Sequence, residues 1–174
     1  MMRNIFLLGM PSSGKSTLGK SLARELNLEF VDMDKRIEIR ELMTVHEIFT
    51  LRGEPYFREI EREILHSLPV NAGLIVSTGG GVPCFFDNMA YIKENGISIF
   101  LDVPPRLLAD RILHTRKNDR PHYSIDQHPD QIVASLEGKL SERRAIYQQA
   151  DVTIEGETDI QTLMEVLRHL GVNV

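Results

Sequence analysis

Residues 9–16 read Gly-Met-Pro-Ser-Ser-Gly-Lys-Ser, the Gly-x-x-x-x-Gly-Lys-Ser pattern of a loop that cradles phosphate groups. An apolar run at residues 5–8 precedes the loop and is short enough for a buried strand. Residues 15–26 follow it with leucines four apart, which is helical spacing. A strand, a glycine-rich loop and a helix in this order predict a phosphate-binding loop, in preference to a glycine-rich turn without a ligand.

The residues of this loop suit a polyphosphate. Backbone N–H groups must surround the phosphates, so side chains have to be absent where the chain approaches them, and Gly9 and Gly14 meet that need. A helix that begins near Lys15 adds the positive end of its dipole. Lys15 then reaches the outer phosphates, and the Ser16 hydroxyl can ligate Mg²⁺. The predicted ATP-phosphate site comprises Ser12, Ser13, Gly14, Lys15, Ser16 and Thr17.

Composition indicates one globular domain over residues 1–174, with 42 % hydrophobic and 26 % charged residues. The net charge of −5 argues against a general nucleic-acid or membrane-surface binder. Cys84 is the only cysteine, so an intrachain disulfide is excluded and a reducing, cytoplasmic location is expected. No apolar run approaches the roughly 18–20 residues of a membrane-spanning helix. Nothing indicates an oligomer, so a monomer is the default expectation.

Short apolar runs alternate with helical patterns along the whole chain. Strands are expected at residues 5–8, 30–31, 74–76, 97–101 and 152–154. Helices are expected at residues 15–26, 55–68, 87–94, 106–113, 130–147 and 159–170. This alternation predicts an α/β fold with a parallel sheet and right-handed crossovers, whose ligands bind at the carboxyl ends of the strands.

Two aspartates follow the second expected strand. In an extended segment residues two apart point to the same side, so Asp32 and Asp34 would both face the ligand crevice. Adjacent carboxylates are costly without cations or donors to satisfy them. One interpretation gives Asp32 to the shell of a Mg²⁺ ion and Asp34 to the hydroxyls of an acceptor substrate. The other makes one of them the cap of a helix over residues 35–40, and spacing alone leaves both open.

The next part of the chain contains a candidate anion clamp. Thr44 and Glu47 have capping-box spacing, and a Gly-Glu-Pro break at residues 53–55 precedes a second helix. On that helix Arg58 and Glu61 are three residues apart and share a face, which suits a guanidinium that is aimed at an anion. A solvated surface pair is the alternative.

Three consecutive glycines, Gly79, Gly80 and Gly81, follow the third expected strand. They carry a large entropic cost and suit a place where backbone lies against a ligand. A flexible hinge is the alternative.

Two later polar positions are ambiguous. Asp102 ends an apolar run, as the magnesium aspartate of a Walker B strand does, but the following prolines favour a cap of the helix that contains Arg106. Arg143 and Arg144 close a helix whose end can approach the crevice, so either is a candidate second anion clamp. A charged face near a helix C-terminus is the alternative.

Residues 111–131 lose the helical pattern and are rich in basic side chains. A long basic stretch in an acidic protein suggests a lid over phosphates, here about residues 112–128, rather than a plain surface loop. Arg120 would stabilise charge on the transferred group.

Taken together, these motifs resemble the shikimate kinase family. The phosphate loop, Asp32 and Asp34, the Phe-Arg-x-x-Glu run at residues 57–61 and the triple glycine match in order. Arg120-Pro121 matches the lid motif of the family, and Arg143 with Tyr147 matches its Arg-x-x-x-Tyr motif. The resemblance covers about residues 4–154. It implies a P-loop NTPase-like three-layer sandwich, similar to nucleoside monophosphate kinases, with strand order 2-3-1-4-5.

The resemblance also implies the reaction and the roles of the residues. ATP would give its γ-phosphate to the 3-hydroxyl of shikimate, producing 3-phosphoshikimate and ADP on the chorismate branch of aromatic amino-acid biosynthesis. Ser16 and Asp32 would hold Mg²⁺, and Lys15, Asp34 and Arg120 would be catalytic. Arg111, Arg116 and Arg120 would complete the ATP site, with Arg111 and Arg116 both candidates for stacking on adenine. Shikimate would contact Asp34, Arg58, Gly79, Gly80, Gly81 and Arg143.

The sequence departs from the family at two places and argues against three other functions. The spacing of the adenine-stacking arginine is shifted, which leaves both Arg111 and Arg116 as candidates. His122 and Tyr123 stand where the lid usually has two leucines. A gluconate kinase-like site has no evident need for both Arg58–Glu61 and the triple glycine. A GTP-dependent switch needs an Asn-Lys-x-Asp motif, which the sequence lacks. A non-catalytic nucleotide-binding module would not need Lys15, Ser16 and both aspartates.

Overall fold

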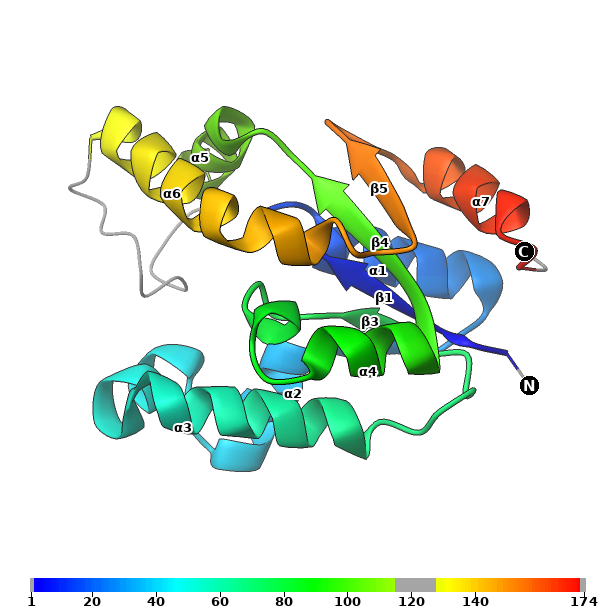
Figure 1. The fold of residues 1–174 in the computed structure, drawn as a ribbon, viewed down its shortest axis with the longest axis horizontal. Helices are drawn as coiled ribbons and strands as arrows, with labels where there is room; N and C mark the ends of the chain where they lie inside the picture. Colours follow the sequence, from blue (N-terminus) through cyan, green and yellow to red (C-terminus); the bar gives the residue numbers. More distant parts are fainter. Residues whose placement is uncertain (1, 115–127, 173–174) are drawn as a thin grey trace.

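The computed structural model describes residues 2–114 and 128–172. Its centre is a five-stranded parallel sheet with strand order β2-β3-β1-β4-β5, so the predicted fold and topology are confirmed (Figure 1). The strands are β1 (Asn4–Leu8), β2 (Phe30–Asp32), β3 (Ile75–Ser77), β4 (Gly96–Asp102) and β5 (Val152–Glu155).

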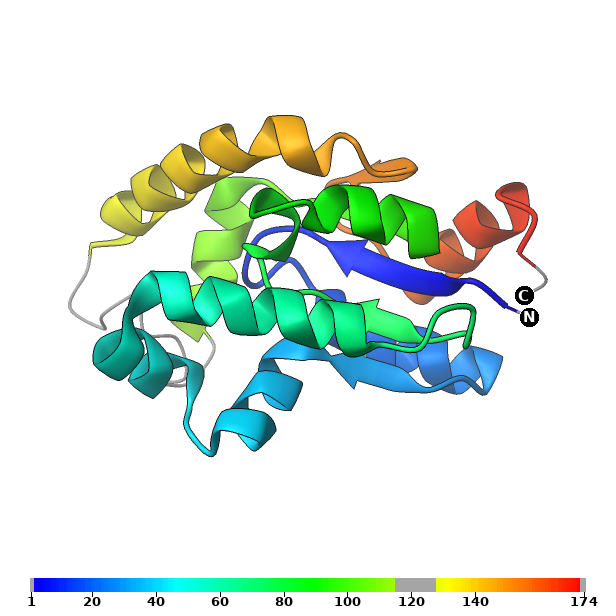
Figure 2. The same ribbon diagram turned by 60° about the horizontal axis from the view of Figure 1, so that its bottom comes forward.

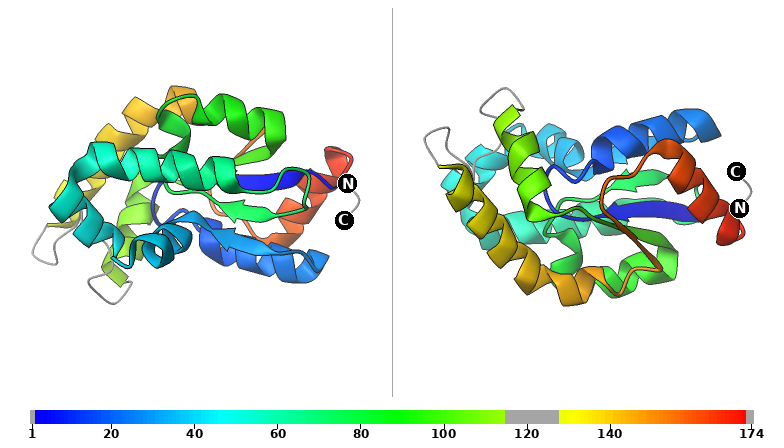
Figure 3. Two further views of the ribbon diagram at one scale, coloured as in Figure 1. Left: turned by 90° about the horizontal axis from the view of Figure 1, so that it is seen from below. Right: turned by 90° about the horizontal axis from the view of Figure 1, so that it is seen from above.

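Helices cover both faces of this sheet and make a three-layer sandwich. They are α1 (Lys15–Leu26), α2 (Met33–Glu41), α3 (Val45–Ser67), α4 (Asn88–Asn95), α5 (Pro105–His114), α6 (Pro129–Tyr147) and α7 (Ile160–His169), with a 3₁₀ turn η1 (Val82–Cys84). Helices α3, α4 and α6 lie on one side (Figures 1 and 2). The view from above in Figure 3 shows α1 and α7 across the sheet from α4 and α6.

The central strand β1 explains why both faces are covered. Ile5 and Leu7 pack in the cluster of α1 and α7, whereas Phe6 and Leu8 pack in the cluster of α3 and α4. All four side chains are buried, because a strand with helices on both sides needs an apolar run and not an alternating pattern. This packing fixes the carboxyl end of β1, where the phosphate loop begins.

The two aspartates do not both lie in an extended segment, contrary to the prediction from the sequence. Strand β2 ends at Asp32 and α2 begins at once at Met33, so Asp34 lies in the first helical turn and not in an extended segment. The expectation of an extended Asp-x-Asp was therefore wrong. Asp32 caps the helix by accepting a hydrogen bond from the Lys35 backbone N–H at 3.3 Å.

Helix α3 contains both segments that the sequence suggested. Thr44 and Glu47 form the expected capping box at its start. Gly53 interrupts the helical backbone with φ of 80° and ψ of 169°, which makes a kink, and the second half continues from Glu54. In the described ranges, 2–114 and 128–172, no helix is long and apolar enough to cross a membrane.

Candidate active site

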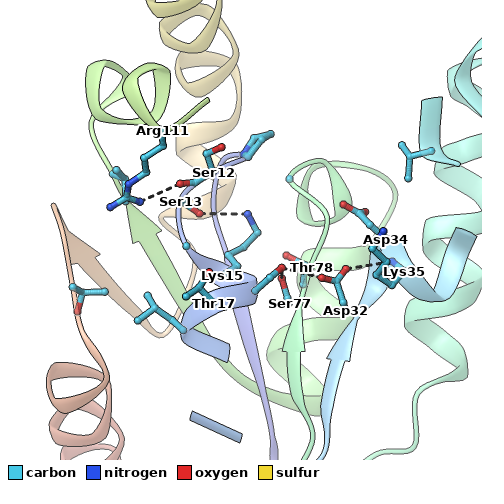
Figure 4. Close-up of a pocket in the computed structure, with 18 of the residues that line it drawn as sticks. Ser12, Ser13, Lys15, Thr17, Asp32, Asp34, Lys35, Ser77, Thr78 and Arg111 are labelled. Carbon is cyan, nitrogen blue, oxygen red and sulfur yellow. Dashed lines mark hydrogen bonds between the residues drawn. The ribbon is translucent and has the colours of Figure 1, made fainter. Parts of the chain in front are cut away.

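A cavity of about 710 Å³ lies against the phosphate loop, where the strands end (Figure 4). Arg111 and Ser12 lie on one side of the cavity and Asp32 and Asp34 on the other, with Lys15 between them. The residues of the predicted site that line it are Ser12, Ser13, Gly14, Lys15, Ser16, Thr17, Asp32, Asp34, Gly80 and Arg111.

The phosphate loop has glycines at positions whose backbone conformation residues with side chains rarely adopt. Gly9 and Gly14 have φ of 143° and 98°, and Gly14 ends the loop as the cap of α1. A Cβ at Gly9 would lie 2.8 Å from the Leu101 carbonyl oxygen, so the loop could not pack against β4 with any larger residue there. The Lys15 ammonium donates to the Gly9 and Met10 carbonyl oxygens at 2.9 and 2.8 Å, within the loop that phosphates would enter.

Oxygen ligands suited to Mg²⁺ gather beside the loop. The Ser16 hydroxyl donates to Asp32 Oδ2 at 2.9 Å and lies 3.1 Å from the Ser77 Oγ. Asp32 therefore caps α2 and also holds Ser16. Its role as a helix cap is compatible with the predicted role in the shell of a Mg²⁺ ion. Mg²⁺ prefers few protein oxygens together with phosphate and water, and this donor set fits that preference.

Arg111 joins the loop to the segment after β5. Its Nη1 donates to the Ser12 carbonyl oxygen at 3.0 Å, and its Nη2 pairs with Glu157 at 2.9 Å. Thr158 lines the same part of the cavity. Arg116, Arg120, His122 and Tyr123, and with them most of the expected lid, lie outside the described residues.

The predicted anion clamp is buried, so the alternative of a solvated surface pair is wrong. The Arg58 Nη1 donates to Glu61 Oε2 at 2.6 Å, and the two residues are 7 % and 1 % exposed. Arg58 also lies over the Phe85 ring, 4.2 Å from its centre. A buried guanidinium held by a carboxylate and an aromatic face keeps one orientation.

Burial also sets the ionisation of this pair. The pKa of Glu61 is raised to about 7, chiefly because burial disfavours its charged form and also because Asp34 is close. Arg58 and Arg143 act in the opposite direction on that pKa. Burial by itself would lower the pKa of Arg58, but Glu61 and Glu54 together raise it above its ordinary value.

We expect this raised pKa to appear as a pH dependence of stability. Between pH 4.5 and 7 the folded chain keeps a proton on Glu61 that the unfolded chain has lost, so the free energy of unfolding falls as pH rises. The fall should be about 3 kcal/mol larger in the wild type than in Glu61→Gln. Chemical denaturation at several pH values measures it. Glu59→Gln, an exposed change on the same helix, should retain the fall; parallel wild-type and Glu61→Gln curves would contradict the assignment.

The triple glycine gives room to the side chains of the site itself. A Cβ at Gly79 would lie 2.8 Å from Glu61 Oε1 and 2.9 Å from Asp34 Oδ1, and one at Gly81 would lie 2.6 Å from Arg58 Cζ. Each glycine carbonyl accepts a hydrogen bond. The donor to Gly79 is the Val82 N–H, the donor to Gly80 is the Tyr147 hydroxyl, and the donor to Gly81 is the Cys84 N–H. These contacts describe a fixed turn, in contrast to the flexible hinge that was the alternative.

The two arginines at the end of α6 have different surroundings. Arg144 donates to both oxygens of Asp102, at 2.5 and 3.1 Å, so it holds β4 to α6. Asp102 is therefore an ion-pair partner, and the expectation that it caps the helix containing Arg106 was wrong, since that helix begins at Pro105. Arg143 instead approaches Gly80, with Nη1 3.3 Å from the position of a Cβ on that glycine.

Comparison with known proteins identifies the family of this chain. The family model described as shikimate kinase matches residues 11–170. The chain belongs to the shikimate kinase family. A shikimate kinase of Bacteroides fragilis is 41 % identical over 97 % of this chain and 96 % of that protein. Membership of this family makes the chain an ATP-dependent kinase.

Solved structures of shikimate kinases superpose closely. A crystal structure from Bacteroides thetaiotaomicron has a TM-score of 0.89 and 37 % identity, covering 99 % of this chain and all of that one. A structure from Acinetobacter baumannii, described as a complex with shikimate, has a TM-score of 0.85 and 31 % identity, covering 98 % and 93 % of the two chains.

Four further residues of this shikimate kinase lie at or near the site, although the sequence did not predict a role for them. Ser77 and Thr78 line the cavity, and their position directly after a strand was the available signal. Tyr147 was matched as part of a motif but given no role, yet it holds Gly80. Glu54 contacts Arg58, and its spacing of four residues on a helix was the signal that could have found it.

One prediction tests the space at the triple glycine. Gly81→Ala should lower kcat/KM for shikimate by about 10²-fold, because the new methyl group displaces a guanidinium that is fixed on two sides. The matched control is Gly138→Ala on α6, where a Cβ meets open space. It should leave steady-state kinetics unchanged and stabilise the fold by about 0.5–1 kcal/mol. Normal kinetics in Gly81→Ala would show that Arg58 tolerates displacement.

Proposed function

We propose that the chain transfers the γ-phosphate of ATP to the 3-hydroxyl of shikimate, giving 3-phosphoshikimate and ADP, with the phosphate loop and the Arg58 clamp as the two halves of one site. The observation that carries this proposal is the position of Gly80. A Cβ there would lie 3.1 Å from Pro11 of the phosphate loop and 3.3 Å from Arg143. The donor half and the acceptor half therefore meet at a single glycine.

The donor half binds the nucleotide. The loop amides and the start of α1 receive the phosphates, and Lys15 leaves the loop carbonyls to neutralise the transferred group. Arg111 secures the loop at Ser12 and borders the nucleotide. Arg116 and Arg120 remain predictions from the sequence for adenine and for the transferring phosphoryl.

The acceptor half binds shikimate through its carboxylate and hydroxyls. Arg58 and Arg143 offer guanidinium donors to the carboxylate, which suits planar two-point recognition. Asp34 receives the hydroxyls, and it lies beside Glu61 across Gly79, which places the hydroxyl end next to the carboxylate end. The three glycines let substrate and side chains approach the backbone closely.

Catalysis in this arrangement is positioning plus electrostatics. Asp34 orients the attacking hydroxyl and is placed to accept its proton, and Lys15 stabilises the negative charge that develops on the phosphoryl oxygens. When bound, Mg²⁺ would be held by Ser16 and, through water, by Asp32, and would neutralise phosphate charge. A covalent intermediate on the protein is unnecessary.

The assignment of the ion and of the state of the protein also belongs to this proposal. Mg²⁺ is the metal that best fits a serine hydroxyl and an aspartate beside nucleotide phosphates. We propose that residues 1–174 act as one monomeric kinase domain in the cytoplasm, since both halves of the site come from a single sheet and the lone cysteine suits a reducing compartment.

A coupled ADP-release assay across three acceptors tests this function. Shikimate should support turnover, whereas gluconate and nucleoside monophosphates should support none above background. Omission of the divalent ion should abolish release. Release with gluconate or a nucleotide but not with shikimate would contradict the proposal.

A further inference from the structure

Arg58 already holds two carboxylates, and only one of them is buried. Glu61 accepts from Nη1 and its side chain is 2 % exposed. Glu54 accepts with its Oε1 from both Nε and Nη2, at 3.0 and 2.7 Å, and its side chain is 53 % exposed. Glu61 is thus a fixed partner, whereas Glu54 occupies the outer edge of the guanidinium from the solvent side.

The edge formed by Nε and Nη2 is one that planar carboxylate recognition uses. A guanidinium has five N–H donors, and Glu54 takes one on each of these two nitrogens with a single oxygen atom. A carboxylate that places one oxygen on each nitrogen makes two parallel bonds, which is the stronger geometry. The Glu54 contact is therefore weaker than the contact that a well-placed substrate carboxylate can form there.

Glu54 is also the more exposed of the two carboxylates. It lies directly after the kink at Gly53, at the start of the second half of α3. Its side chain is 53 % exposed, so water can hydrate the carboxylate when it leaves the buried Arg58. Burial and the nearby Arg143 lower the pKa of Lys139 on α6, and the Glu54 charge acts in the opposite direction, so a second cation lies near Glu54.

We propose that Glu54 holds the place of the substrate carboxylate on Arg58 and competes with shikimate for that guanidinium. This inference rests on the proposed function. In the free enzyme Glu54 keeps Arg58 aimed into the site and partly neutralised. Shikimate must displace it, so a ligand that binds through a carboxylate alone gains little, whereas one that also reaches Asp34 through hydroxyls gains enough to bind.

Glu54→Gln tests the competition, because glutamine keeps the size and the acceptor oxygen but removes the charge. We expect KM for shikimate to fall by about three- to tenfold, with kcat within about twofold and KM for ATP unchanged. Isothermal titration calorimetry without ATP should show the same gain in shikimate affinity. Glu59→Gln, an equal charge change at an exposed position of α3, should leave shikimate affinity unchanged.

The methyl ester of shikimate separates charge from space. It lacks the negative carboxylate, so Glu54→Gln should not tighten its binding. An unchanged or higher KM for shikimate in Glu54→Gln would overturn the competition and make Glu54 a residue that only positions Arg58. An equal gain for the ester, or in Glu59→Gln, would also overturn it. Failure of the wild type to release ADP with shikimate would instead overturn the proposed function.

Discussion

Lys15→Ala should reduce kcat by about 10³-fold or more and leave the affinity for shikimate nearly unchanged. The Lys15 ammonium is buried in the loop and donates to the carbonyl oxygens of Gly9 and Met10 and to the Ser13 hydroxyl. No other lysine lies in this loop, so the variant loses the charge that would meet the outer phosphates.

The control for this prediction is Lys20→Ala on the same helix. Lys20 is exposed and lies over the Phe30 ring, away from the loop, so its loss should leave kcat within about twofold. Single-turnover kinetics and thermal unfolding of both variants separate chemistry from folding. Near-wild-type turnover in Lys15→Ala would refute the role of the phosphate loop in transfer.

Arg58→Ala should lower kcat/KM for shikimate by about 10²- to 10³-fold while ATP affinity stays within about twofold. Arg58 is the proposed donor to the substrate carboxylate, and it is 7 % exposed. Its loss also leaves Glu61 without its nearest positive charge, so Glu61 should take up a proton and its pKa should rise further above 7. The fold is thereby spared an unpaired buried charge.

The matched control is Arg62→Ala, one helical turn farther along α3. Arg62 is 42 % exposed in its side chain and pairs with Asp87, so its loss should change neither shikimate nor ATP affinity. Steady-state kinetics with each substrate varied, together with calorimetric titration of an ATP analogue, measure both affinities. If Arg58→Ala lost ATP affinity as far as it lost activity, Arg58 would belong to the nucleotide site.

The sequence predicted the fold well because its signals were local. The phosphate loop, the alternation of apolar runs with helical patterns and the capping box at Thr44 each depend on residues close in the chain. The parallel sheet followed from that alternation. The strand order came from the family resemblance, since local patterns do not say which strands pair.

The details of the site depended on contacts between distant segments, which a single sequence does not reveal. Arg143 and Arg144 are chemically equal in the sequence, and only the approach of Asp102 separates them. Helix α2 begins at Met33, so Asp34 does not lie in the extended segment that the sequence predicted. Both aspartates nevertheless line the cavity. Burial of Arg58 and Glu61 required the triple glycine to come close across about 20 residues of chain, as the space at Gly81 shows.

The same distinction explains the triple glycine. Its composition indicated close approach, but the partner was expected to be a ligand. The structure shows that the space left by the missing Cβ atoms of Gly79 and Gly81 is used by Glu61, Asp34 and Arg58. The glycines therefore leave room for side chains of the proposed acceptor half.

A crystal structure with shikimate and a non-hydrolysable ATP analogue tests most directly whether the two halves form one site. We expect the shikimate carboxylate on Arg58 and Arg143, the 3-hydroxyl beside Asp34, and the terminal phosphate at Lys15, in line with that hydroxyl. Shikimate bound with its carboxylate away from Arg58, or with its 3-hydroxyl turned away from the terminal phosphate, would contradict the account.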